Sequence, residues 1–231
     1  MNDRKPKLVI STGAGISAES GLATFRDSDG LWANYNVMEV ASHEGYLKNP
    51  SLIHDFYNHR RKEAAKAEPN AAHLALAKLE ERFDVIIITQ NVDTLHERAG
   101  SSRVVHLHGR VDMVEATDNP NKVFKLNPED AETSVDTVIE GHHVLPHIVF
   151  FGEAVPNFET AAQYASQADI FVIIGTSLQV YPAASLLSYV RPGVPVYYID
   201  PHPAANIPSY VHTIALPATL GVERLTHMLT Q

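Results

Sequence analysis

The segment KLVISTGAGISAESG near the amino terminus constrains the fold most, because a short apolar run enters a glycine-rich turn with no linker between them. An apolar run of this length that ends at glycine predicts a buried strand over residues 7–12. Gly13 and Gly15 allow the backbone to turn tightly and to approach a ligand closely. A helix that begins near Ala14 would direct its free N–H groups at an anionic group over the turn. The spacing Gly13-x-Gly15-x-x-Ala18 therefore indicates a dinucleotide phosphate site, although ordinary tight turns produce the same spacing.

The composition limits the classes of protein that this chain can belong to. Its 231 residues suffice for one α/β domain or for a large and a small lobe, and 45% apolar with 19% charged residues is typical of a soluble globular protein. A net charge of −9 without an extended Lys/Arg cluster disfavours nucleic acid as an obligate partner. Neither a membrane-spanning segment nor a signal-peptide pattern is found, so we expect a cytoplasmic protein with no membrane partner, and a monomer. The absence of cysteine excludes disulfides, thiolate metal ligands and a cysteine nucleophile.

Strand-like runs alternate with helical periodicity along most of the chain, which predicts an α/β fold: a Rossmann-like parallel sheet with helices on both faces. The predicted strands are 7–12, 84–89, 104–107, 147–151, 170–175, 194–199 and 212–216, and the predicted helices are 51–67, 70–82, 158–168, 182–190 and 220–229. Two stretches interrupt this alternation, and we interpret them as two insertions that form a small lobe. The predicted large lobe is 1–27, 70–109 and 146–231, and the predicted small lobe is 28–69, a helical module, and 110–145.

Polar side chains follow several of the predicted strands, where a parallel sheet opens onto its ligand crevice. Gln90, Asn91 and Asp93 follow one strand, and they either meet a ligand or cap the next turn. His108 ends another strand, with His106 on the same face, and is either a general base or one of 13 histidines with a structural hydrogen bond.

Two further strand ends carry groups suited to a nucleotide. Gly175, Thr176 and Ser177 offer a small residue and two hydroxyls, which serve equally well as helix caps. Asp200 can accept ribose hydroxyls, or it can begin a turn before Pro201.

In this order, the motifs resemble those of the sirtuin family. The residues that carry the resemblance are Gly13-Ala14-Gly15-Ile16-Ser17, Ser20-Gly21, Phe25-Arg26, Thr89-Gln90-Asn91-Val92-Asp93-Thr94-Leu95-His96, Leu107-His108-Gly109, Phe151-Gly152-Glu153 and Gly175-Thr176-Ser177-Leu178. The resemblance covers nearly the whole chain, and the combination is specific although each part is not. It implies an NAD-dependent protein lysine deacylase that binds NAD and acyl-lysine proteins between a large and a small lobe, and releases nicotinamide and O-acyl-ADP-ribose.

The resemblance also implies roles for individual residues. It makes His108 the catalytic base and gives Asn91 the task of orienting ribose hydroxyls or water. The NAD-binding residues that it implies are Gly13, Ala14, Gly15, Ser17, Phe25, Arg26, Gln90, Asn91, Asp93, Gly175, Thr176, Ser177 and Asp200, with Phe25 and Arg26 in a mobile loop. Asp200 departs from the asparagine of many family members, which puts the recognition of the adenosine ribose in doubt.

Two groups of residues are expected to bind the substrate. Tyr57 and Arg60 share one face of a predicted helix, where a phenol and a guanidinium can grip a carboxylate, although an ordinary helix surface has the same pattern. With Ala41, this pair is similar to the sirtuins that remove succinyl and malonyl groups, so we expect such groups to be good substrates and acetyl to be possible. The family's peptide-binding edge corresponds to Val149, Phe151, Gly152 and Glu153, which otherwise form a buried strand ending in a solvated glutamate.

One departure from the family concerns zinc, because sirtuins commonly hold a structural zinc with two cysteine pairs in the small lobe. Asp112, Asp118, His142, His143 and His147 do not have the spacing of a zinc module. We therefore expect no zinc, and a small lobe held by hydrophobic contacts. The residues expected to make these contacts are Val114, Val123, Phe124 and Val138.

Three competing functions use the same pocket. A protein mono-ADP-ribosyltransferase would transfer ADP-ribose to an acceptor protein, and an idle NAD-sensing module would only bind partners. Asn91 and His108 favour deacylation over the transferase, and the presence of Asn91, Asp93 and His108 argues against the idle module. A dehydrogenase is disfavoured because its fingerprint needs an acidic residue at the end of the next strand, whereas Asp84 begins that strand.

Overall fold

A computed structural model describes residues 4–24, 35–127 and 131–230. Its larger sheet is parallel throughout and has the order β10-β9-β8-β1-β2-β3. The strands are β1 (Lys7–Thr12), β2 (Asp84–Thr89), β3 (Val104–His106), β8 (Ile170–Ile174), β9 (Val196–Ile199) and β10 (Val211–Ile214). Because β1 lies between β2 and β8, the strand order reverses there, and the carboxyl ends of these strands form a crevice of the kind in which α/β proteins bind ligands. The predicted α/β fold with a parallel sheet is confirmed.

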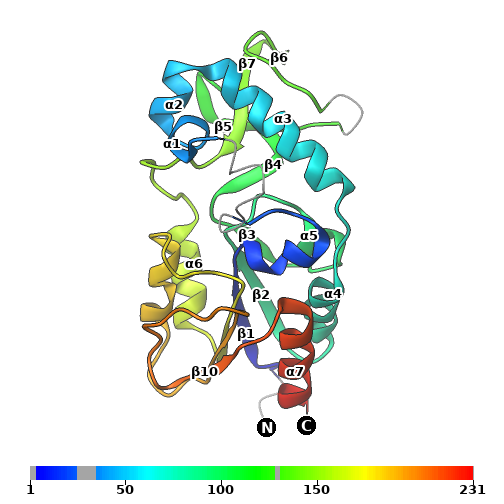
Figure 1. Cartoon of the computed structure of the whole chain (residues 1–231), viewed down its shortest axis with the longest axis vertical. Helices are drawn as coiled ribbons and strands as arrows, with labels where there is room; N and C mark the ends of the chain where they lie inside the picture. Colours follow the sequence, from blue (N-terminus) through cyan, green and yellow to red (C-terminus); the bar gives the residue numbers. More distant parts are fainter. Residues whose placement is uncertain (1–3, 25–34, 128–130, 231) are drawn as a thin grey trace.

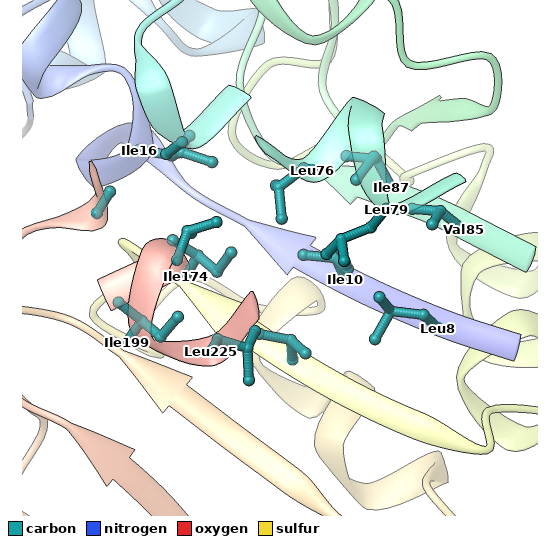
Figure 2. Packing of buried hydrophobic residues seen from close by; sticks show 14 of the residues in the cluster. Leu8, Ile10, Ile16, Leu76, Leu79, Val85, Ile87, Ile174, Ile199 and Leu225 are labelled. Atoms are coloured by element: carbon teal, nitrogen blue, oxygen red, sulfur yellow. The ribbon is translucent and has the colours of Figure 1, made fainter. Parts of the chain in front are cut away.

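Helices cover both faces of this sheet (Figure 1). On one face, α4 (Ala71–Lys78) and α7 (Ala218–Thr230) pack on a cluster that includes Leu8, Ile10 and Ile87 (Figure 2). On the other face, α6 (Phe158–Ser166) and the 3-10 helix η6 (Ala183–Tyr189) pack on a second cluster. Burial on both faces explains why the strands are continuous apolar runs without polar alternation.

A second, antiparallel sheet has the order β5-β4-β7-β6 and lies in the upper part of Figure 1 beside three helices. Its strands are β4 (Gly109–Ala116), β5 (Asn119–Lys125), β6 (Val138–Ile139) and β7 (His142–Ile148), and the helices are α1 (Val37–Val40), α2 (His43–Lys48) and α3 (Pro50–Lys66). Phe56 and Tyr57 of α3 pack against Val111, Ile148 and Phe150. The exact boundaries of the two lobes stay a prediction. Strand β7 spans the predicted boundary between residues 145 and 146.

The structure corrects three local predictions. The strand predicted at 147–151 is instead β7, which belongs to the antiparallel sheet and ends at Ile148, after which Phe151 makes only one bridge, to Ser42. The helix predicted from Ala14 is replaced by two 3-10 turns, η1 (Ala14–Ile16) and η2 (Ala18–Ser20); Ser17 N donates to Ala14 O over 3.0 Å, and Gly15 N donates to Gly175 O over 2.8 Å. The segment predicted as a helix at 182–190 is likewise 3-10.

The core predicted for the small lobe is also partly wrong. Val114 is fully buried, but Val123 and Val138 are 39% and 52% exposed. Val114 packs instead with Leu126 and Val144, and Phe124 lies at the margin of this cluster. The alternation of β5 turns Val123 outward, and β6 is a short edge strand with little to cover it.

Gly109 fixes the junction between the two sheets, directly after His108. Its φ is +81°, and a Cβ there would overlap the carbonyl oxygen of His147. We predict that Gly109→Ala lowers the free energy of unfolding by about 3 kcal/mol or more, because it combines backbone strain with a steric clash.

Gly141 provides a matched control for this substitution. Its φ is +85°, and nothing lies within 4 Å of a Cβ built on it. Gly141→Ala should therefore cost only about 1 kcal/mol of backbone strain. Urea denaturation of both variants measures the difference, and equal losses would contradict the proposed clash.

Candidate active site

The turns that follow β1 and β8 lie against each other through glycine. Gly13 N donates to Ile174 O over 3.0 Å, and a Cβ on Gly15 would lie 2.6 Å from the Cα of Gly175. These glycines are thus required for the contact between the two turns, a role that sequence analysis did not include beside the tight turn and the approach to a ligand. Thr176, next in the chain, accepts a 3.2 Å hydrogen bond from Gln90 Nε2, which connects the turn after β8 with the segment after β2.

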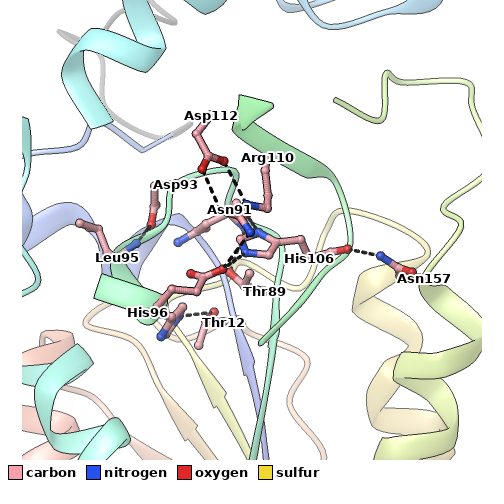
Figure 3. A network of polar contacts seen from close by, with 11 residues as sticks. Thr12, Thr89, Asn91, Asp93, Leu95, His96, His106, Arg110, Asp112 and Asn157 are labelled. Carbon is pink, nitrogen blue, oxygen red and sulfur yellow. Dashed lines mark hydrogen bonds and ion pairs between the residues drawn. The ribbon is translucent and has the colours of Figure 1, made fainter. Parts of the chain in front are cut away.

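Ser17 joins the first turn to the polar segment after β2. Asn91 Nδ2 donates to Ser17 Oγ over 3.1 Å, and that hydroxyl donates to Asp93 Oδ2 over 3.0 Å. Asp93 also accepts a hydrogen bond from Leu95 N (Figure 3). The alternative role of Asp93 as a cap of the next turn is therefore correct for one of its two carboxylate oxygens. Burial raises the pKa of Asp93, which the hydrogen bonds from Leu95 and Ser17 oppose. The segment therefore presents a buried carboxyl group beside an amide.

His108 has a defined tautomer. Its Nδ1 lies 3.1 Å from the carbonyl oxygen of Gln90. Because a carbonyl oxygen can only accept, Nδ1 carries the hydrogen, and the neutral ring has its lone pair on Nε2. Burial lowers the pKa of His108, although the hydrogen bond to Gln90 opposes this shift. The ring is consequently neutral at pH 7, with Nε2 able to accept a proton.

His106 and Glu97 form a side-chain contact that sequence analysis missed. His106 Nδ1 lies 3.0 Å from Asn91 O and must donate, and its Nε2 lies 2.8 Å from Glu97 Oε1. Burial acts to raise the pKa of Glu97, but the hydrogen bond and charge of His106 outweigh it, and the pKa lies below its usual value. Arg110 lies 3.8 Å from Glu97 and pairs with Asp112. The only sequence signal was that His106 shares a face with His108.

The segment that is expected to bind the substrate peptide contacts the site through the backbone of His108. Val149 N donates to His108 O over 3.1 Å, and Phe151 N donates to Ala41 O over 2.8 Å. Gly152 follows with a φ of +96°, and Glu153 is exposed, as the alternative expected, although its carboxylate also has partners within the chain. Its carboxylate lies 2.8 Å from His43 Nδ1 and accepts from Phe150 N over 2.9 Å.

Tyr57 and Arg60 lie on α3, close to this segment. The Tyr57 ring is 4% exposed and packs edge-on against Phe150, with 6.2 Å between the ring centroids. Burial raises the pKa of Tyr57, which the charge of Arg60 opposes and that of Glu153 reinforces. The Arg60 side chain is 13% exposed, and its Nη1 lies 3.5 Å from Glu63 Oε2. A phenol and a largely buried cation thus lie one helical turn apart.

The remaining predicted residues are placed as follows. Asp200 is buried after β9 and accepts a hydrogen bond from His202 N, as its turn alternative expects. Ser177 is half-buried beside Thr176. Phe25 and Arg26 lie outside the described residues.

Two negative findings apply to residues 4–24, 35–127 and 131–230. Within these ranges, no three histidine or carboxylate side chains come together as a metal site. No helix in the same ranges is both long and apolar enough to cross a membrane.

Comparison with known proteins gives the family. A model of the Sir2 family matches residues 13–182. A relative from Bacteroides thetaiotaomicron is 52% identical over 96% of this chain and 97% of its own length, and one from Helicobacter pylori is 48% identical over 97% of both; each is named NAD-dependent protein deacylase. The chain belongs to the Sir2 family, the sirtuins that its motifs resemble.

Solved structures agree with this assignment. A Sir2 homologue in complex with NAD superposes with a TM-score of 0.85 at 35% identity, covering 97% of this chain and 90% of that one. Sir2 bound to an acetylated peptide superposes with a TM-score of 0.80 at 28% identity, covering 98% and 94%.

Buried histidines behind the site should make the fold sensitive to acid. His96 Nε2 shares a 3.1 Å hydrogen bond with Thr12, and its ring lies 4.9 Å from that of His73, centroid to centroid. Burial lowers the pKa of both rings, that of His73 to about 4. Below pH 6.5 the unfolded chain binds a proton at each of these histidines, whereas the folded chain does not until the pH reaches the lower folded pKa. The free energy of unfolding is therefore highest above pH 6.5 and decreases as the pH falls from 6.5 toward the folded pKa.

The shift at His73 alone corresponds to a loss on the order of 3 kcal/mol between pH 6.5 and pH 4. We predict that His73→Gln flattens the pH dependence of unfolding in that window, whatever it costs in absolute stability. Urea titrations at several pH values measure this. The control His227→Gln removes an exposed histidine of α7 and should leave the slope unchanged; an unchanged slope in His73→Gln would refute the assignment.

Proposed function

We propose that this chain is an NAD-dependent protein lysine deacylase that accepts succinyl and malonyl groups as well as acetyl. NAD-dependent protein deacylation is the activity in the names of relatives that are about half identical to the chain over nearly its whole length. The observation that carries the chemistry is the tautomer of His108, whose Nδ1 donates to Gln90 O and leaves Nε2 to accept a proton.

The residues around His108 suit the groups of NAD. When bound, NAD supplies a ribose carbon that exchanges nicotinamide for the oxygen of an acyl-lysine. Asn91, Asp93 and Ser17 form a hydrogen-bonded set of amide, carboxyl and hydroxyl that can exchange partners with a carboxamide and ribose hydroxyls. Gln90 and Thr176, from the ends of two strands, offer further polar groups.

The chain's own residues then position groups and move a proton. His108 Nε2 removes a proton from a ribose hydroxyl, and its low pKa keeps it ready to do so at neutral pH. Asn91 orients hydroxyls without adding charge, while its backbone carbonyl is held by His106. Burial of the site excludes water and strengthens these interactions.

Acyl selectivity is assigned to Tyr57 and Arg60. A guanidinium that is 13% exposed is little screened by water, and it can bind a succinyl carboxylate through two parallel hydrogen bonds. This carboxylate competes with Glu63, 3.5 Å from Nη1, for the same cation. Tyr57 stays neutral, because burial raises its pKa, and can donate its hydroxyl hydrogen.

Nicotinamide release from NAD in the presence of matched acetyl-, succinyl- and unmodified lysine peptides tests the function as a whole. Release that requires an acylated peptide supports deacylation. Transfer of ADP-ribose to protein favours the transferase, and binding of NAD without turnover favours the idle module. A cytoplasmic location, a monomeric state and a small lobe without metal stay predictions.

Replacement of His108 should abolish proton removal but preserve the fold. We predict that His108→Gln lowers kcat/KM by about 10²-fold or more. The exposed His143 gives a control, His143→Gln, which should retain full activity. Because the pKa of His108 is lowered, kcat/KM at pH 6.5 should exceed half of its maximum and fall only at more acidic pH. A half-maximal rate above pH 6.5 would remove His108 from this role.

Replacement of Arg60 should separate the two acyl groups. We predict that Arg60→Met lowers kcat/KM for succinyl-lysine about tenfold or more, but that for acetyl-lysine less than about threefold, because only succinyl carries a carboxylate. Lys62→Met, an exposed cation of the same helix, is the control and should change neither rate. Equal losses with both acyl groups in Arg60→Met would rule out the assigned selectivity.

A further inference from the structure

A hollow of about 500 Å³ lies beside the expected substrate segment. It is lined by Met38, Ser42, His43, Glu44, Phe151, Gly152 and Glu153. Residues 38–44 form one side of this hollow and residues 151–153 form the other. Backbone contacts hold the two segments together, because Phe151 N donates to Ala41 O and Ser42 forms a β-bridge with Phe151.

The segment that lines the hollow also contacts His108. Val149 N donates to His108 O, and Phe151, which lines the hollow, is only two residues further along the chain. Two extended residues span about 7 Å. A substrate that runs along this segment with its acyl-lysine at His108 would therefore place a side chain from within about three residues of the lysine at the hollow.

The walls of the hollow combine apolar surface with carboxylates. Met38 and Phe151 are 56% and 41% exposed, which is unusual for large apolar side chains that line the same depression. Glu44 and Glu153 contribute negative charge. Glu153 is paired with His43, whereas Glu44 makes no ion pair within the described part of the chain.

We propose that this hollow binds a lysine or arginine side chain of the substrate protein, located within about three residues of the acyl-lysine. This inference rests on the proposed function. The aliphatic stem of such a side chain covers Met38 and Phe151, and its cationic end reaches Glu44. An arginine can also stack on the exposed Phe151 ring. An acidic side chain would instead face two carboxylates, so the hollow selects against it.

Acetyl-lysine peptides test this inference, because a neutral acyl group leaves Arg60 out of the comparison. Each of the three positions on either side of the lysine is set in turn to arginine, lysine, alanine or glutamate, and kcat/KM is measured with the full chain. We expect one or two adjacent positions at which arginine and lysine exceed alanine by about fivefold, and glutamate falls below alanine. This difference should shrink as salt is added.

Glu44→Gln should remove most of this preference but leave the rate with the alanine peptide unchanged. The matched control Glu39→Gln changes an exposed carboxylate of α1 that does not line the hollow, and it should keep the full preference. Equal rates with all four side chains, or a preference that survives in Glu44→Gln, would overturn the inference. A complete lack of NAD-dependent turnover with every peptide would instead count against the proposed function, so the two failures are distinguishable.

Discussion

The parallel register of β1 with its two neighbours is the constraint on which the site depends. Thr12, at the end of β1, pairs with Thr89 of β2 and with Ile174 of β8, so the three strands end at the same level. Gln90 N and Gly13 N continue the ladder by donating to Thr12 O and Ile174 O. Every segment that carries a candidate NAD-binding group leaves the sheet at or beside this edge. A shift of one residue in any of these pairs would turn the apolar side chains of that strand to the other face and separate the segments, so the core and the site have a common origin.

Charge is distributed in two ways around this edge. Burial shifts the pKa values of the groups nearest to His108, because it lowers the pKa of His108 and raises that of Asp93. Behind them, Glu97 lies 2.8 Å from His106 Nε2 and 3.8 Å from Arg110, which in turn pairs with Asp112. Since His106 holds Asn91 through the backbone carbonyl, the amide side chain of Asn91 stays available to a ligand while its main chain is fixed. His106 thus positions the main chain of Asn91 without occupying its side-chain amide.

Local sequence predicted most of the fold, and order along the chain predicted the membership of the site. The bounds of β1 and β2 follow from apolar runs that end at polar residues, which is a strictly local signal. The 3-10 turns after β1 were missed because the glycine spacing indicates that a turn begins, but not whether its backbone hydrogen bonds join residues three or four apart. The pairing of Glu97 with His106 was missed because no periodicity connects a short helix, α5 (Leu95–Arg98), with the strand that follows it. The strand at 147–151 was misplaced because an apolar run cannot indicate at which residue it leaves its sheet.

The charges of Arg60 and Glu63 on α3 affect turnover as well as acyl selectivity in the proposed function. In the proposed reaction, every substrate acyl-lysine, neutral or negative, becomes a lysine that carries a positive charge. In the proposed function, Arg60, largely withdrawn from solvent, would attract a succinyl carboxylate but repel the ammonium group of the product. The same cation that would select the substrate would therefore also favour release of the product. Glu63, 3.5 Å from Arg60, limits both effects by keeping the cation partly neutralised whenever no acyl carboxylate is present. In the proposed complex, the desolvation free energy of the buried Arg60 guanidinium would be offset partly by Glu63 and partly by the acyl carboxylate of the substrate.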